Sequence, residues 1–277
     1  MKKLFLLTTT LILLISCSKD TPTFEHTIIP VTTKDDMEPI SDKQLIDSVT
    51  LYIGTGVNKF DYNYDNKNRL IDLHLRASGS TITDADYLYT YDDENKLIRS
   101  VVTTDRTIAT YDFSYENKIP VLVTYADASN PKNNLIIKLK NNGSQITDWT
   151  EFSSATLPEK EGTTSKYIYE NQNSTSQIML FPPESGGKVS NTTNTEYGIN
   201  KNPFIYTGYK WRLPGITFAN KNDQLKETSV GIPGTTIRTS TYTYNKQGYP
   251  ITQLIKSSTD GGPISDTKYV YKYIDAK

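Results

Sequence analysis

The chain has few of the residues on which most catalytic and metal-binding chemistry depends. Among its 277 residues there are one cysteine and two histidines. A single cysteine can form neither an internal disulfide nor a zinc site made of cysteines. Neither sign of charge is in excess, because 30 Lys and Arg balance 31 Asp and Glu to a formal net charge of -1. Nucleic-acid binders cluster Lys and Arg against phosphates, so the composition argues against that class.

The first seventeen residues have the order of an export signal. Two lysines precede the apolar stretch Leu4–Ile15, which only three threonines interrupt, and Ser16 then precedes Cys17. Such a stretch is shorter than a membrane span, and its flanks are those of a signal peptide. Leu14–Cys17 resembles the lipobox of bacterial lipoproteins, which implies cleavage before Cys17 and lipid on its sulfur. The alternative is an ordinary signal peptide with an incidental cysteine.

The sequence divides the chain into three parts. Residues 1–16 are expected to be the lipoprotein signal peptide, and residues 17–41 the lipidated cysteine with a flexible tether that holds three prolines. Residues 42–277 are expected to form a single repeat-built β domain. No segment of it approaches the ~18 apolar residues of a membrane helix. We therefore expect an outer-membrane lipoprotein of the bacterial cell envelope, on either the periplasmic or the surface face.

Self-similar units run through the expected β domain at intervals of 21–30 residues. The two strongest are Tyr64–Leu70 (YDNKNRL) and Tyr91–Leu97 (YDDENKL). Weaker copies begin at Tyr115, Leu139, Tyr169, Tyr197, Phe218 and Tyr244. Alternating aromatic residues before an anchor lie on one face of a strand, and the Asn- and Asp-rich cluster after it supplies turn residues. Because a second β-rich run follows, each unit is predicted to be a β-hairpin.

These units predict an all-β fold. We expect an antiparallel meander of about sixteen strands, built from YD/RHS-like hairpin repeats and forming a strongly curved or wrapped sheet. Whether the sheet closes into a barrel is left open by the sequence. No segment shows a long helical period, and at most a short helix is expected at Asp42–Ile46.

The Tyr-Asp-x-x-Asn-[Lys/Arg]-Leu units at Tyr64 and Tyr91 resemble the YD repeats of the RHS superfamily. Combined with the lipoprotein start, the hairpins over residues 47–275 resemble more closely the DUF4595-type lipoproteins of Bacteroidetes. The resemblance implies a hairpin-built β fold and a cell-envelope setting. It implies no catalytic residue.

Segments that interrupt the tyrosine pattern are the candidate ligand site. The repeated tyrosines are interpreted as cross-strand ladders, each pair worth roughly 0.2–1 kcal/mol, and a sugar-stacking platform is the alternative. Both tryptophans lie in irregular segments, where ligand sites are usually built. Each could instead cap an exposed sheet edge. The predicted ligand-binding residues are Trp149, Tyr206, Tyr209, Trp211 and Arg212.

Four oxygen-bearing residues are weak candidates for a metal site. Asp61, Asn63, Asp65 and Asp72 have the spacing of the first, third, fifth and last ligands of a calcium loop. Asn66 takes the place of the glycine that makes the sharp turn in such loops, and the flanks are predicted strands. We therefore expect no EF-hand, and we assign no resident metal or cofactor.

The leading hypothesis is a non-enzymatic binding module for a glycan or a protein partner, attached to the membrane through the lipid on Cys17. A structural or assembly role through paired sheet edges is one alternative. A glycoside hydrolase is another, since it needs only two suitably spaced carboxylates, although the sequence singles out no pair. We assign no catalytic residue. An outer-membrane barrel is disfavoured because many charged residues are expected on alternate strand faces.

Overall fold

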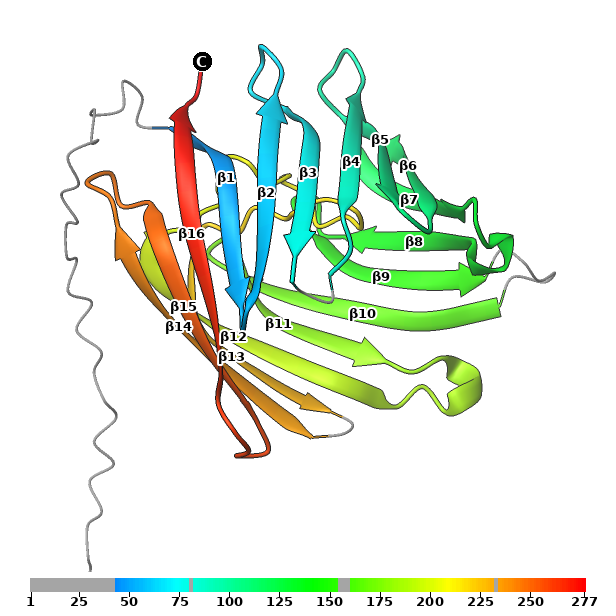
Figure 1. Ribbon diagram of the computed structural model, residues 1–277. Helices are drawn as coiled ribbons and strands as arrows, with labels where there is room; N and C mark the ends of the chain where they lie inside the picture. Colours follow the sequence, from blue (N-terminus) through cyan, green and yellow to red (C-terminus); the bar gives the residue numbers. More distant parts are fainter. Residues whose placement is uncertain (1–42, 80–81, 154–159, 232–233) are drawn as a thin grey trace, which may run out of the picture.

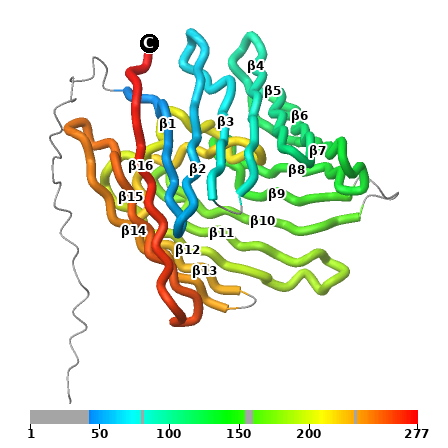
Figure 2. The backbone as a smooth tube through the Cα atoms, in the orientation of Figure 1, coloured from blue at the N-terminus to red at the C-terminus, as the bar shows by residue number. Residues whose placement is uncertain are grey.

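The computed structural model describes residues 43–79, 82–153, 160–231 and 234–277. The predicted signal peptide, Cys17 and the tether lie outside these described residues. Within them, sixteen β-strands form one antiparallel sheet that closes into a barrel, because β1 pairs with both β2 and β16. Figures 1 and 2 show these three strands side by side, with the C-terminus at the end of β16.

Each strand is hydrogen-bonded to its neighbours in the sequence all the way around the barrel. Two short 3-10 helices, η1 (Pro131–Asn133) and η2 (Pro183–Ser185), lie in the connections. The strands are β1 (Gln44–Ile53), β2 (Gly56–Tyr64), β3 (Leu70–Ser78), β4 (Ala85–Tyr91), β5 (Leu97–Thr104), β6 (Ile108–Glu116), β7 (Ile119–Asp127), β8 (Leu135–Asn141), β9 (Ile146–Ser153), β10 (Lys160–Glu170), β11 (Asn173–Leu180), β12 (Val189–Lys201), β13 (Asn222–Gly231), β14 (Thr235–Tyr244), β15 (Pro250–Thr259) and β16 (Ser265–Asp275). Nowhere in the described parts of the chain is there a helix long and apolar enough to cross a membrane.

The predicted all-β meander of about sixteen strands is confirmed, and the wrapped sheet closes completely. The short helix expected at Asp42–Ile46 is wrong, because β1 begins at Gln44 and pairs with β16 from its first residue. The prediction that a hairpin unit begins at Phe218 is also wrong. Phe218 lies between β12 and β13 and not at a hairpin turn, whereas the other seven anchors lie near the ends of even-numbered strands.

Alternation along the strands places one set of side chains, rich in aromatic residues, inside the barrel and the other set outside. On β2, Tyr62 is 7% exposed inside the barrel, while its neighbours Asp61 and Asn63 face outward. Core residues come from most of the strands and from the β12–β13 connection. They are Ile46, Val49, Tyr62, Leu70, Leu73, Tyr89, Leu97, Phe113, Val123, Ile137, Leu139, Ile146, Trp211, Leu213 and Tyr271.

Ion pairs occupy outward positions on several strands. On β3, His74 lies with one ring nitrogen 3.0 Å from Asp72 and the other 2.7 Å from Asp86. Arg99 on β5 pairs with Asp112 on β6. Apolar side chains share this outer face, among them Leu88 on β4 and Ile168 on β10, which are 53% and 50% exposed.

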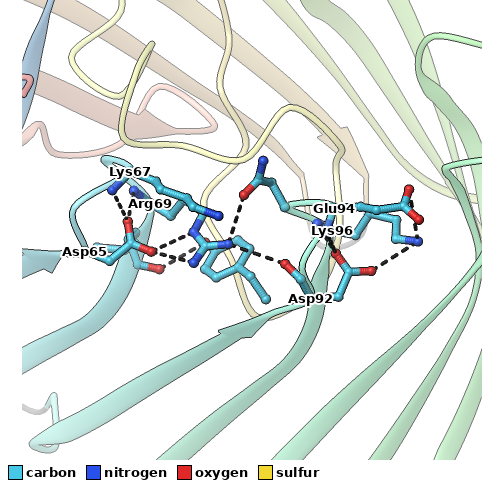
Figure 3. A network of polar contacts seen from close by, with 9 residues as sticks. Asp65, Lys67, Arg69, Asp92, Glu94 and Lys96 are labelled. Carbon is cyan, nitrogen blue, oxygen red and sulfur yellow. Dashed lines mark hydrogen bonds and ion pairs between the residues drawn. The ribbon is translucent and has the colours of Figure 1, made fainter.

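The turn after β2 shows what each residue of the repeat does. Asp65 Oδ1 accepts hydrogen bonds from the backbone amides of Lys67 and Arg69, both at 2.9 Å. Asp65 Oδ2 pairs with the Arg69 guanidinium at 2.6 Å (Figure 3). Asn68 has a φ of 61°, a left-handed conformation that asparagine tolerates. Leu70 then returns to the interior, where it is 3% exposed.

The turn after β4 repeats this arrangement and contacts the first one. Asp92 Oδ1 accepts from the amides of Glu94 and Lys96 at 3.0 and 2.8 Å, and Asp92 Oδ2 pairs with Lys96 at 3.1 Å. The Arg69 guanidinium lies 4.8 Å from the centre of the Tyr91 ring. Consecutive turns therefore interlock through a cation and an aromatic ring, a contact of roughly 0.5–1 kcal/mol at exposed sites.

Tyrosine hydroxyls link consecutive hairpins around this end of the barrel. In each link, the hydroxyl of a tyrosine near the end of one strand donates a hydrogen bond to a backbone carbonyl near the start of the preceding strand. The turns that follow the even-numbered strands all lie at one end of the barrel, because alternate connections of a meander share an end. We call this end the tight-turn end. The links are Tyr64 to Ile46, Tyr91 to Leu70, Tyr115 to Leu97, Tyr169 to Ile146, Tyr197 to Ser174, Tyr242 to Gln224 and Tyr273 to Pro250, at 2.6–2.9 Å.

Candidate functional site

The connection between β12 and β13, residues 202–221, enters the barrel interior, and we call it the luminal segment. Figure 1 shows it in yellow behind β1–β4. Thr207 Oγ1 accepts a hydrogen bond from the Ile46 amide at 2.9 Å and lies 2.9 Å from the Tyr64 hydroxyl. These bonds attach the luminal segment to β1 and β2 at the tight-turn end.

Two further contacts attach the luminal segment to β5. The Leu97 amide donates to the Tyr209 hydroxyl at 3.2 Å, and the Ser100 hydroxyl donates to the Gly215 carbonyl at 3.1 Å. Gly215 has a φ of 75°, and a Cβ built there would lie 2.8 Å from the Tyr111 ring. Only glycine fits this position, since a side chain would strain the backbone and collide with the ring.

An aromatic cavity of about 410 Å³ lies inside the barrel beside the luminal segment. Strands β1–β4 and β16 form one wall of the cavity, and the luminal segment lines the other side. Its lining residues are Val49, Phe60, Tyr62, Leu73, Tyr87, Tyr89, Phe204, Gly215, Ile216, Thr217 and Tyr269. The volume falls within the roughly 300–1,000 Å³ typical of small-molecule sites.

The cavity presents aromatic faces and neutral hydroxyls. Phe60, Tyr87 and Tyr269 are only partly buried. Burial raises the pKa of Tyr87, and it is the largest of the causes that raise the pKa values of Tyr62 and Tyr89 well above the ordinary value. All three phenols therefore stay protonated near neutral pH and can both donate and accept hydrogen bonds. Such a surface suits a ligand with flat apolar faces and hydroxyl edges.

A second, polar cavity of about 160 Å³ lies against the opposite wall, and we call it the Arg212 chamber. Strands β11–β13 supply most of its lining, and the luminal segment contributes the rest. The lining residues are Ser174, Gln177, Thr193, Thr195, Tyr197, Arg212, Asn220, Gln224 and Glu227. Burial raises the pKa of Tyr197 to about 12, while the Arg212 charge acts in the opposite direction.

The five predicted ligand-binding residues do not come together in one site. Trp149 is on β9, partly buried, with its ring edge-on to Tyr167 at 5.8 Å. Trp211 is 5% exposed within the core, so its indole face is not available for stacking. Tyr206 is 38% exposed. Tyr206 and Tyr209 line a small cavity of about 160 Å³ at the tight-turn end. Arg212 alone among the five lines the polar chamber.

The alternative in which each tryptophan caps a sheet edge does not fit this fold. Closure of the barrel pairs every strand on both sides, so the sheet has no edge to cover. Trp211 instead fills the interior from the luminal segment.

The four metal candidates have other partners. Asp61 pairs with Lys59 at 2.7 Å, and Asp65 is held in its turn by Arg69. The Asn63 side-chain amide donates to Asp72 at 2.6 Å. Among the described residues, no group of three or more His, Cys, Asp or Glu side chains is placed to hold a metal ion.

Sequence reasoning missed most of the aromatic cavity. Phe60, Tyr62, Tyr87, Tyr89 and Tyr269 belong to the regular aromatic pattern, which was interpreted as structural ladders with a sugar-stacking platform as the alternative. They follow the same alternation as the tyrosines that pack the core, so the sequence holds no signal that separates the two groups. Which aromatic residues face open space depends on where the luminal segment stops filling the barrel.

Two solved structures resemble this fold. A porin-like protein from Bacteroides uniformis aligns with a TM-score of 0.53 and 14% identity, covering 82% of this chain and 97% of that one. A porin-like protein from Bacteroides vulgatus aligns with a TM-score of 0.54 and 12% identity, covering 83% of this chain and 99% of that one. At such identities the similarity shows the fold alone. No family model and no curated protein matches this chain.

Proposed function

We propose that this protein is a lipid-anchored protein of the bacterial outer membrane that binds a glycan, without chemical conversion, in the aromatic cavity of its barrel. The aromatic cavity is the observation that carries the proposal. The lipobox-like Leu14–Cys17 supports the anchor, and the YD-like units support kinship with envelope lipoproteins. The porin-like barrels from two Bacteroides species are compatible with this setting.

Sugar recognition follows from the chemistry of the lining. The apolar face of a pyranose ring can stack on rings such as Phe60 and Tyr87, and phenolic hydroxyls can bond its edge. The cavity of about 410 Å³ has room for a short saccharide or the end of a longer glycan. A protein partner that adds a strand to the sheet is less well supported, since the closed barrel offers no unpaired edge.

Calorimetric titration with a panel of neutral oligosaccharides tests the proposal. We expect Tyr87→Ala to weaken binding by about tenfold, because stacking on an aromatic ring is worth of order 1 kcal/mol or more. Tyr52→Ala is the matched control, since Tyr52 lies on the outer face and is 41% exposed. Equal losses in the two variants, or no binding to any sugar, would contradict the proposal.

The same panel separates binding from hydrolysis. A glycoside hydrolase would release reducing ends from one of the oligosaccharides, whereas a binding protein leaves them intact. The anchor has its own test: labelled palmitate should enter the wild-type protein and not the Cys17→Ser variant. Label retained by Cys17→Ser would contradict lipidation at this cysteine.

A further inference from the structure

Arg212 is held inside the barrel by two aromatic rings. Its guanidinium carbon lies 4.7 Å from the centre of the Tyr167 ring and 4.6 Å from that of Phe218. The flanking residues Trp211 and Leu213 are 5% and 4% exposed, so both neighbours anchor the backbone in the core. The cation is therefore fixed in position before any ligand arrives, which is the condition for tight, specific recognition by arginine.

The Arg212 guanidinium is incompletely satisfied by the protein. Its Nε is buried and has no hydrogen-bond partner. Among the described residues, no ion pair with Arg212 is formed, and the nearby Tyr169 hydroxyl donates its hydrogen bond to the Ile146 carbonyl at 2.8 Å. A guanidinium presents five N–H donors in a planar fork, and the Arg212 side chain as a whole is only partly buried. Arg212 thus has at least one buried N–H donor that is available to a ligand.

The chamber beside Arg212 offers neutral polar groups. Ser174 and Thr193 contribute hydroxyl-bearing side chains, and Gln177 and Asn220 contribute amides. These groups can hydrogen-bond the oxygens of a bound anion. The cavity of about 160 Å³ is smaller than a whole oligosaccharide site and fits a single charged group.

One carboxylate also lines the chamber, and its charge is already compensated. Glu227 pairs with the Arg238 guanidinium and accepts a hydrogen bond from Gln224 Nε2 at 3.2 Å. Of the two charged residues that line the chamber, Glu227 therefore has its cation in Arg238, while Arg212 has no ion-pair partner among the described residues. An anion entering the chamber would supply Arg212 with the ion-pair partner that it lacks.

From this geometry we infer that the Arg212 chamber is a binding site for a carboxylate group, with the Arg212 guanidinium as its charge partner and the surrounding hydroxyls and amides as further donors. The inference stands apart from the proposed sugar site, because the two cavities have no lining residue in common. The carboxylate can belong to a free small acid or to an acidic sugar, and both sources present the same group to Arg212.

Calorimetric titration of the full-length protein with acetate, glucuronate and glucose, at constant ionic strength in chloride, tests the inference. We expect acetate or glucuronate to bind, and Arg212→Gln to weaken that binding about tenfold or more, as charge-assisted hydrogen bonds imply. Arg99→Gln is the matched control, because it removes the same charge from an ion pair on the outer face. Glucuronate binding more tightly than acetate identifies a sugar acid as the source, and equal binding identifies a free acid.

A second variant keeps the test independent of misfolding. The Asn220 side-chain oxygen accepts a hydrogen bond from the Ser174 amide at 3.0 Å, and Asn220→Asp keeps this acceptor while adding a negative charge beside the anion. We expect the same loss of carboxylate binding with circular dichroism and thermal midpoint close to wild type. Three results would overturn the inference: binding of neither acid, equal effects of Arg212→Gln and Arg99→Gln, or an equal Arg212→Gln loss for glucose.

Discussion

The Tyr91 hydroxyl donates a hydrogen bond of 2.9 Å to the Leu70 backbone carbonyl. Tyr91 ends the first strand of one hairpin, and Leu70 begins the second strand of the hairpin before it. The bond therefore joins two repeats, and its equivalents recur around the tight-turn end. This explains why the repeat uses tyrosine at its anchor in place of phenylalanine, which would pack equally well but could not donate.

Removing the Tyr91 hydroxyl should destabilise the barrel measurably. We expect Tyr91→Phe to lower the free energy of unfolding by about 1 kcal/mol, the usual net value of such a bond, or somewhat more because it leaves the Leu70 carbonyl unpaired. Urea denaturation followed by circular dichroism measures the change. Tyr52→Phe on the outer face is the control. Equal stabilities of the two variants would show that the hydrogen bond from Tyr91 to Leu70 contributes nothing measurable to the free energy of unfolding.

The turn carboxylate Asp65 should make stability depend on acid pH. Burial acts to raise its pKa, but hydrogen bonds from Arg69 and Lys67 outweigh burial and hold the pKa below the usual value of 3.8. Ionised Asp65 therefore stabilises the folded state above that usual value, and this contribution is lost as pH falls through the lower folded pKa. Asp65→Asn keeps an oxygen acceptor and removes the charge, so it should cost stability at pH 7 and progressively less toward about pH 2.

Unfolding free energies measured at intervals across the acid range check this expectation. Asp105→Asn is the control for loss of one negative charge, since Asp105 lies in the exposed β5–β6 connection at the other end of the barrel. A constant difference between wild type and Asp65→Asn at every pH would mean that the carboxylate charge of Asp65 does not contribute.

Thr207 should control how firmly the luminal segment is held. Thr207→Val has nearly the same shape, but it removes the acceptor for the Ile46 amide and the hydrogen bond to Tyr64. We expect a loss of about 1–3 kcal/mol, because a buried donor is left unpaired. Hydrogen exchange should become faster at the Ile46 amide and across residues 202–221. Thr103→Val on the outer face is the control, and unchanged protection of the luminal segment in Thr207→Val would refute its anchoring role.

Local features of the fold could be predicted because each depends on a few neighbouring residues. Alternating aromatics as at Phe60, Tyr62 and Tyr64 predicted strands, and the clusters after Tyr64 and Tyr91 predicted the turns that Asp65 and Asp92 organise. The failures came where distant parts of the chain meet. A short helix was expected up to Ile46, but Gln44–Ile46 begin strand β1 because β16, more than two hundred residues away in the sequence, pairs with them.

The hairpins, their aromatic faces and the scarcity of cysteine and histidine chemistry follow from the local sequence, and Cys17 remains the most specific prediction made from it. Closure of the sheet is a property of the tertiary fold, because it depends on β1 meeting β16. The tertiary fold also turns the luminal segment inward, with an aromatic cavity on one side of it and the Arg212 chamber on the other. The same tyrosine alternation produces packed and cavity-lining residues alike, and their difference arises only from what fills the barrel beside them.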